Sequence, residues 1–141
     1  FYQKNFITLF IENRNIIYVR PENANEGALL QAARWSTNGG DLVFVYKDNV
    51  YFMAEGFVTV NRVTENTDKY IYNGIPDWIY EEEILAVSTA FWFNAEGSKL
   101  AYAQFNDTGV DIQEYPWYGD TIDDSNVYLE RVEIKYPKVS Y

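Results

Sequence analysis

Three consecutive glutamates, Glu81, Glu82 and Glu83, follow two aromatic residues, Trp78 and Tyr80, in the middle of the chain. Successive helical residues point about 100° apart, so two of the three carboxylates can converge on one object. Two carboxylates a few ångströms apart repel each other, and their pKa values rise unless a cation lies between them. A ligand ammonium meets this requirement, and an aromatic wall can add a cation–π contact. The segment therefore has the residue types of an ammonium-binding site.

The same acidic run has a simpler interpretation. Acidic side chains are favoured near a helix N-terminus by the helix dipole, and runs of charge are common on solvated faces. From composition alone this second interpretation is favoured, because charge runs are frequent and binding sites are rare. The residue types by themselves leave both interpretations open.

The residues before the glutamates predict the helix that carries them. Ile75 precedes Pro76, which favours an extended entry, and Asp77 can cap a helix by accepting a hydrogen bond from a backbone N–H two or three residues later. Residues 78–85 then supply about two helical turns, with the glutamates in or just after the first. We expect a short acidic helix at 77–85, inserted into a chain that is otherwise strand and turn.

Length and charge limit the classes of protein to which the chain can belong. Its 141 residues suffice for one core, are too few for two ordinary domains, and fit equally well a piece of a larger protein. No apolar run approaches the roughly 20 residues that span a bilayer. With 21 acidic and 11 basic residues the net charge is −10, which disfavours nucleic acid and anionic membranes as partners and favours cationic ones.

Cysteine and histidine are both absent from the sequence. Without cysteine there is neither a disulfide framework nor a thiolate metal site. Without histidine the commonest general base is missing, so a complete Ser-His-Asp triad is excluded within these residues. The acidic stretch 118–125 has carboxylates suited to Ca²⁺ but lacks the alternate spacing of an EF-hand loop, and we expect it to be solvated. We therefore predict no metal, no cofactor and no catalytic residue in this segment.

Strand propensity dominates the rest of the chain, because Tyr, Phe, Val and Ile occur in short runs between turn residues. The clearest hairpin spans 41–53. The expected strands are 6–11, 16–20, 29–35, 41–46, 49–53, 57–63, 69–72, 87–93, 99–105, 111–115 and 127–134.

An internal repeat indicates how these strands are grouped. One copy contains Trp35 and the other contains Trp92. In each copy the Trp ends one strand, a turn that contains Gly reverses the chain, and an apolar strand follows. Trp92 lies 57 positions after Trp35, slightly more than the roughly 40 to 50 residues of common propeller blades. We predict four-stranded blades with the acidic helix as an insertion, and we assign both Trp side chains to the core. Because a few blades alone would expose unpaired edges, we expect a larger ring.

The same segments resemble a known family. Residues 35–39 and 92–103 resemble the W-S-P-x-G-x-x-L-A-Y turns of prolyl-oligopeptidase-type propellers. More specifically, residues 71–83 and 101–108, together with the ending 136–138, look like the dipeptidyl peptidase IV family. The D-W-x-Y-E-E-E motif is specific to that family. The resemblance extends from about Trp35 to Pro137 and is vague before Trp35.

The resemblance implies a serine exopeptidase that releases Xaa-Pro or Xaa-Ala dipeptides from peptide N-termini. It also implies that Glu82 and Glu83 bind the α-ammonium of the substrate, with Glu81, Trp78 and Tyr80 in support. The catalytic serine, aspartate and histidine would belong to an α/β-hydrolase domain outside this segment. A blocked amine would leave two desolvated carboxylates unpaired, which explains a requirement for a free N-terminus.

As part of that family's N-terminal propeller, residues 1–141 would form about two to three four-stranded blades of an eight-bladed, all-β ring. The implied partners are peptides with a free N-terminus, the C-terminal hydrolase domain of the same protein and a second copy in a homodimer, with no nucleic acid. The implied location is extracellular, as a secreted protein or the ectodomain of a type II membrane protein. The sequon that begins at Asn106 is consistent with this setting.

Some residues depart from the family pattern. The carbonyl-binding arginine of the family aligns with residues 1–4, where Gln3 and Lys4 occur and arginine does not. Ala86 stands where a serine often follows the last glutamate. Non-catalytic relatives that partner potassium channels keep the triple-glutamate motif, so a partner-binding ectodomain is the alternative to a peptidase.

Overall fold

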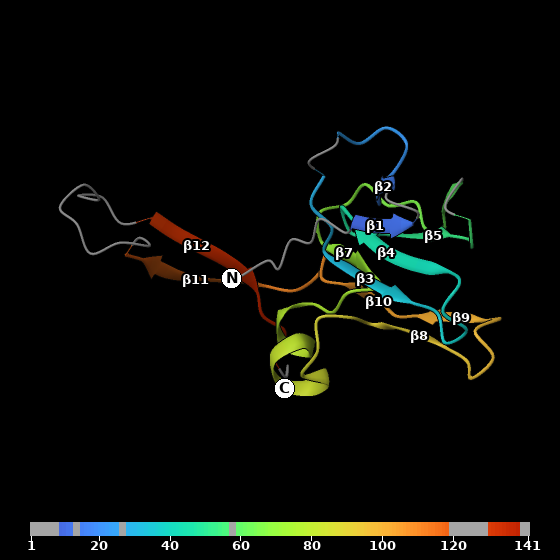
Figure 1. Ribbon diagram of the computed structural model, residues 1–141. Coiled ribbons are helices and arrows are strands. Elements are labelled where there is room, and N and C mark those ends of the chain that lie inside the picture. The colour runs from blue at the N-terminus through green and yellow to red at the C-terminus, as the bar shows by residue number, and fades with distance from the viewer. Residues whose placement is uncertain (1–8, 13–14, 26–27, 57–58, 119–129, 139–141) are drawn as a thin grey trace.

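The computed structural model describes residues 9–12, 15–25, 28–56, 59–118 and 130–138. These residues form twelve strands and one short helix (Figure 1). The strands are β1 (Leu9–Glu12), β2 (Asn15–Tyr18), β3 (Ala32–Trp35), β4 (Leu42–Tyr46), β5 (Asn49–Met53), β6 (Val60–Arg62), β7 (Ile71–Asn73), β8 (Phe91–Phe93), β9 (Leu100–Tyr102), β10 (Gln104–Asn106), β11 (Ile112–Trp117) and β12 (Glu130–Lys135). The helix, η1, spans Tyr80–Leu85.

All strand pairs among these residues are antiparallel. β3, β4, β5 and β6 form one four-stranded sheet in sequence order, and the other strands pair as β1–β2, β7–β10, β8–β9 and β11–β12. The β7–β10 pair encloses the helix and the β8–β9 hairpin in sequence, while the β11–β12 hairpin extends away from the other sheets (Figure 1). The predicted β-rich fold with a four-stranded antiparallel unit is confirmed, and the larger ring stays a prediction.

Several predicted strands differ in their limits. The expected strand 99–105 is divided into β9 and β10, because the backbone of Ala103 bonds to Ala90 and Gly74 in place of a hairpin partner. The expected strand 29–35 is reduced to β3, and 87–93 is reduced to β8. Most of the acidic stretch 118–125 lies outside the described residues.

The core lies on both faces of the four-stranded sheet. β4 is buried along almost its whole length, from Leu42 to Val45. Because side chains alternate along a strand, they enter two separate clusters. One cluster contains the buried side chains of Val19, Leu30, Leu42, Phe44, Tyr51 and Met53. The other contains Ala32, Val43, Val45, Val50 and Phe91, so it joins the sheet to β8.

The predicted hairpin 41–53 is confirmed as β4–β5. Lys47 and Asp48 form its two-residue turn, and both have positive φ, at 47° and 59°. This conformation is that of a type I′ turn, whose twist matches the twist of the flanking strands. The turn therefore fixes the register in which Val45 pairs with Val50.

The internal repeat corresponds to two similar turns that touch each other. In the first, the Ser36 N–H donates to Asp41 O at 2.8 Å, and in the second the Asn94 N–H donates to Lys99 O at 3.1 Å. Gly39 and Gly97 have φ of 80° and 72°. The hydroxyl of Thr37 donates to the Asn94 carbonyl at 2.8 Å, so one turn packs on the other.

The assignment of both Trp side chains to the core was wrong, since Trp35 is 38% exposed and Trp92 is 46% exposed. Each belongs to a strand that has one paired neighbour in the described part of the chain. Trp92 follows the fully buried Phe91, so alternation along the strand places it on the opposite face. Trp35 ends β3, next to the turn.

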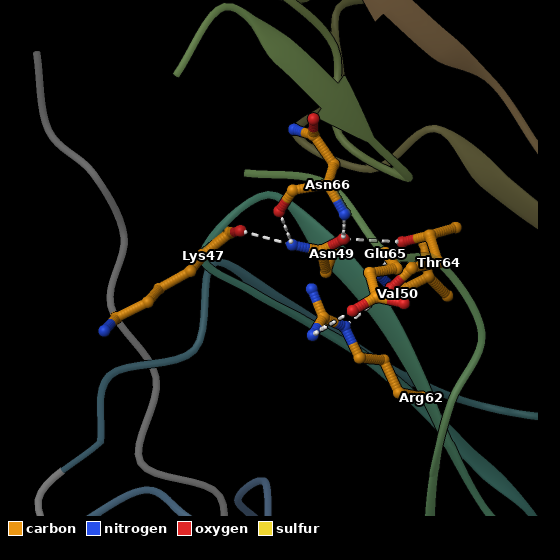
Figure 2. A network of polar contacts seen from close by, with 7 residues as sticks. All are labelled: Lys47, Asn49, Val50, Arg62, Thr64, Glu65 and Asn66. Atoms are coloured by element: carbon orange, nitrogen blue, oxygen red, sulfur yellow. Dashed lines mark hydrogen bonds and ion pairs between the residues drawn. The ribbon is translucent and has the colours of Figure 1, made fainter. Parts of the chain in front are cut away.

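Asn49 connects the end of the hairpin to the segment that leads toward β7 (Figure 2). Its side chain is 3% exposed. The Asn49 amide donates to the carbonyls of Lys47 and Asn66, both at 2.9 Å. Its oxygen accepts from the Asn66 N–H at 2.8 Å and from the Thr64 hydroxyl at 3.1 Å. Every hydrogen-bonding group of this buried amide is thus used to hold residues 64–66 against β5.

We expect Asn49→Ala to lower the free energy of unfolding by about 2–4 kcal/mol, because it removes four hydrogen bonds and leaves buried backbone groups without a partner. Urea denaturation followed by Trp fluorescence measures this change. Asn61→Ala, on the exposed side of β6, is the matched control, with an expected change below about 0.5 kcal/mol. Equal effects of the two substitutions would contradict a structural role for the Asn49 network.

Candidate ammonium-binding site

The segment that leads into the helix is fixed by hydrogen bonds at each step. The fully buried Asn73 amide donates to Asp48 O at 2.9 Å, and its oxygen accepts from the Gln104 side chain at 2.7 Å. The Gly74 N–H donates to Ala103 O at 3.0 Å, and the Gly74 carbonyl accepts from the Ala90 N–H at 2.8 Å. The chain therefore leaves β7 in one defined direction.

Gly74 is required at this point for two physical reasons. Its φ is 72°, a conformation that L side chains rarely adopt. A Cβ there would lie 2.7 Å from a methyl carbon of Val50 and 3.2 Å from one of Val45. The helix entry thus packs directly on the second core cluster.

Asp77 caps the helix as predicted. Its carboxylate accepts from the Tyr80 N–H at 2.8 Å, and its carbonyl accepts from the Glu81 N–H at 2.9 Å. Residues 78 and 79 are α-helical, and the backbone then widens into the π-helical turns of η1. The helix ends at Ala86, which is left-handed with φ of 53°. The predicted helix at 77–85 is confirmed, whereas its π geometry, which is frequent at functional sites, was not predicted.

The three glutamates do not share one environment. Glu82 and Glu83 are exposed, whereas Glu81 is half-buried and faces a cavity. Among the residues that the structure describes, no lysine or arginine forms an ion pair with Glu82 or Glu83. Two adjacent carboxylates on one short helix are therefore left available to an external cation.

The aromatic residues of the motif hold the helix on two sides. Tyr80 contacts Phe105 of β10 with ring centroids 4.8 Å apart, and Trp78 contacts Tyr136, just after β12, at 5.2 Å. Both rings were predicted to support the site as a wall for the cation. In this structure their ring contacts are with other aromatic residues, so their observed support is to the position of the helix.

A cavity of about 550 Å³ lies beside the helix, between β7, β12 and the β4–β5 turn. The acidic and phenolic side chains that line it include Asp48, Tyr72, Asp77, Glu81 and Asp107, and Lys135 lines it from β12. Asp107 is 4% exposed and Asp77 is 5% exposed. This group of side chains could not be predicted from the sequence, because its members come from separate elements.

Burial and mutual repulsion alter the acidity of these side chains. The pKa of Asp107 is raised to about 6, first by burial and then by the nearby charge of Asp77, while Lys135 opposes the shift. The pKa of Tyr72 is raised to about 12, first by burial and then by the charges of Asp107, Asp48 and Asp77. The pKa of Asp48 is raised by burial, against a hydrogen bond from Gln31 at 2.7 Å. The cavity therefore holds carboxyl groups that retain protons more readily than free ones.

Other predicted features have simpler outcomes. Asn106 is exposed, and its side-chain oxygen accepts from the Thr108 hydroxyl at 2.7 Å. In the described ranges, no three His, Cys, Asp or Glu side chains lie close enough together to hold a metal ion. No helix among the described residues is long and apolar enough to cross a membrane. Residues 1–4, where the carbonyl-binding arginine would align, lie outside the described residues.

Comparison with known proteins gives concordant results. The sequence profile of the family described as "Dipeptidyl peptidase IV (DPP IV) N-terminal region" matches residues 2–141. The "Probable dipeptidyl peptidase 4" of Aspergillus fumigatus strain CBS 144.89 is 36% identical over 135 residues, which cover 96% of this chain and 17% of the relative. The "Dipeptidyl peptidase 4" of Trichophyton tonsurans is 37% identical over 139 residues, with 99% and 17% covered.

A solved structure agrees with these sequence matches. The crystal structure of Porphyromonas gingivalis dipeptidyl peptidase 4 is similar with a TM-score of 0.65 at 27% sequence identity. The match covers 84% of this chain and 16% of that structure. The chain thus spans less than a fifth of the length of the proteins it matches.

We expect Gly74→Ala to be clearly more destabilising than Gly39→Ala. Both residues have positive φ, but a Cβ at Gly39 has no atom within 4 Å. The backbone conformation alone costs about 1–2 kcal/mol in each variant. The clash with Val50 adds about 1–3 kcal/mol at Gly74. Urea denaturation measures the free energy of unfolding of both variants, and the difference between them is the cost of the clash with Val50. Equal losses in the two variants would show that the helix entry does not depend on this close packing.

Proposed function

Because the chain belongs to the dipeptidyl peptidase IV family, we propose that it forms part of the substrate-recognition propeller of a serine exopeptidase. The reaction is release of Xaa-Pro or Xaa-Ala dipeptides from peptide N-termini. The catalytic α/β-hydrolase domain is then another part of the same protein, consistent with the small share of each relative that the chain covers. The role of this segment is to bind the free N-terminus of the substrate.

The observation that carries the proposal is the exposure of Glu82 and Glu83 side by side on a rigidly held helix, without a cation from the described residues. When two carboxylates converge on one ligand, a positive group on that ligand relieves their mutual repulsion. An α-ammonium offers three N–H donors, which both carboxylates can accept together. Hydrogen bonds of this charged kind are about twice as strong as neutral ones.

The rigid support of the helix bears on specificity. Asp77 caps its first turn, and the rings of Trp78 and Tyr80 each contact an aromatic ring of another element. An ammonium bound at a fixed position places the second residue of the peptide at a fixed distance from it. The enzyme would therefore cut after two residues because the amine is held, and positioning of this kind contributes strongly to rate.

We also propose that the chain supplies about two to three blades of an eight-bladed ring. Support comes from the four-stranded sheet and from the packing of the two repeat turns, in which Thr37 contacts Asn94. Phe91 of the second unit enters the core cluster of the first. Face-to-face packing of successive sheets is how propeller blades bury their apolar surfaces.

The proposed setting is a secreted or cell-surface ectodomain, glycosylated at Asn106 and assembled as a homodimer. Asn106 is exposed, as a glycan acceptor must be. The β11–β12 hairpin projects from the other sheets and exposes Ile112 and Trp117, which suits contact with a second copy (Figure 1).

Glu82→Ala or Glu83→Ala in the full-length protein should lower kcat/KM for a Gly-Pro substrate by about 100-fold, equivalent to about 2.7 kcal/mol. This is the loss expected when a charge-assisted hydrogen bond to the ammonium is removed. Thermal unfolding should be unchanged, since both side chains are exposed. Glu96→Ala, an exposed glutamate in the β8–β9 turn, serves as the control. Retained cleavage in both helix variants would remove the proposed role of the pair.

The second test compares a chromogenic Gly-Pro substrate with the same substrate acetylated on its amine. We expect the full-length protein to cleave only the free-amine form, because acetylation removes the cation and leaves both carboxylates without a partner. Equal cleavage of the two forms would contradict ammonium recognition. Absence of any cleavage by a folded sample would favour the non-catalytic, partner-binding alternative.

A further inference from the structure

A buried amide joins the β4–β5 turn to the segment that enters η1. The side chain of Asn73, at the end of β7, is fully buried. Its amide group and its backbone N–H both donate to the carbonyl of Asp48, at 2.9 Å and 3.2 Å. The side chain of Gln31 holds this turn, because it accepts from the Asp48 N–H at 2.8 Å and donates to the Asp48 carboxylate at 2.7 Å. The nitrogen of the Asn73 amide is therefore bonded to a fixed element.

The oxygen of the same amide is bonded to an exposed side chain. Gln104 lies directly opposite Asn73 in the β7–β10 pair (Figure 1), and its side-chain amide donates to the Asn73 oxygen at 2.7 Å. Side chains at opposite positions of an antiparallel pair lie on the same face and can interact directly. Gln104 is exposed, whereas Asn73 is buried. A side chain at the surface thus supplies a hydrogen bond to an amide in the interior.

The connection between Asn73 and the helix is short and stiff. Gly74 packs against Val50 and leaves no room for a side chain. Pro76 has a fixed φ, and the residue before a proline is restricted to extended conformations. Asp77 then caps the helix by accepting from a backbone N–H at 2.8 Å. A displacement of Asn73 is therefore passed on to the first turn of η1, because no flexible residue lies between them to absorb it.

We propose that Gln104 is a positioning residue for recognition of the substrate N-terminus, which acts by holding the Asn73 amide and, through it, η1. This inference rests on the proposed ammonium-binding function of that helix. Without the donor from Gln104, the oxygen of the buried amide loses a partner, which is costly unless the amide moves toward another donor. Such a movement shifts Glu82 and Glu83, and the substrate ammonium then binds less tightly.

Three substitutions of Gln104 separate hydrogen-bond donation from the other properties of the side chain. At neutral pH, Gln104→Lys keeps a donor, Gln104→Glu keeps only acceptors, and Gln104→Met keeps neither at a similar length. The measured quantity is the KM of the full-length protein for a free-amine Gly-Pro substrate. If η1 occupies its binding position in only a fraction of the molecules, KM should rise about fivefold to tenfold in Gln104→Glu and Gln104→Met. The KM of Gln104→Lys should stay within about twofold of the wild type.

The charges of these variants make the expected order informative. An added positive charge repels a substrate ammonium, and an added negative charge attracts it. Long-range electrostatics alone would therefore give Gln104→Lys the higher KM and Gln104→Glu the lower one, which is the reverse of the expected order. The same three substitutions at Asn61, an exposed amide on β6, are the control. They should leave KM within about twofold of the wild type.

A comparison of KM with kcat separates positioning from a general loss of structure. A serine-directed fluorophosphonate without an amine counts the active molecules, so that kcat is expressed per active site. We expect kcat and the rate of reaction with this reagent to stay near the wild-type values in all three Gln104 variants, because only binding of the ammonium is weakened. A fall in both rates with an unchanged KM would show a merely structural role and overturn the inference.

Hydrogen exchange of the segment 75–85, measured by mass spectrometry on the full-length protein, gives a readout that needs no activity. We expect faster exchange in Gln104→Glu and Gln104→Met than in the wild type, and wild-type exchange in Gln104→Lys. Should Gln104→Glu not fold, the comparison of Gln104→Met with Gln104→Lys decides on the same terms.

The outcomes separate this inference from the proposed function. If the wild type cleaves the free-amine substrate but KM is equal in the three Gln104 variants, the inference is wrong and the proposed function stands. If the wild type does not cleave, the proposed function fails, and the order of the exchange rates alone decides whether Gln104 positions η1.

Discussion

Burial of β4 and β5 on both faces is the constraint on which the rest of the structure depends. A strand that is apolar along both faces cannot lie at a surface, so each face needs a cover. One face is covered by residues around Val19 and Leu30, and the other by Phe91. Gly74 lies against the same second face, where Val45 and Val50 leave no room for a side chain. The packing of the sheet thus determines where the chain can turn toward the helix.

The position of the helix follows from that turn. Hydrogen bonds of Asn73 and Gly74 set its direction, Asp77 sets its first residue, and the rings of Trp78 and Tyr80 fix it against separate elements. A helix of six π-helical residues is too short to be stable by itself, so these contacts are the source of its order. These contacts hold the helix in place while Glu82 and Glu83 stay exposed on it. A binding site needs side chains whose positions are fixed in this way by their surroundings.

Features specified by neighbouring residues were predictable from the sequence, and features specified by distant residues were not. The β4–β5 hairpin and the Asp77 cap depend on a few adjacent residues, and both were found. The division between β9 and β10 depends on Ala90 and Gly74, which are remote in sequence from Ala103. The cavity beside the helix brings together Asp77 and Asp107, which are thirty positions apart in the sequence. Sequence periodicity carries no information about such contacts. Alternation places Phe91 and Trp92 on opposite faces of β8, but packing against the distant four-stranded sheet decides that Phe91 is the buried one.

The two interpretations of the acidic run make different demands on the surrounding structure. A solvated helix face needs only the helix dipole and water, and its position relative to the sheet is of no consequence. The observed helix is instead capped by a buried carboxylate, held between two aromatic contacts and entered through a glycine that permits close packing. A solvated face requires neither a buried carboxylate at its cap nor aromatic contacts along the helix. Binding of an ammonium does require Glu82 and Glu83 to be held in fixed positions, so the contacts that hold the helix support the ammonium-binding interpretation.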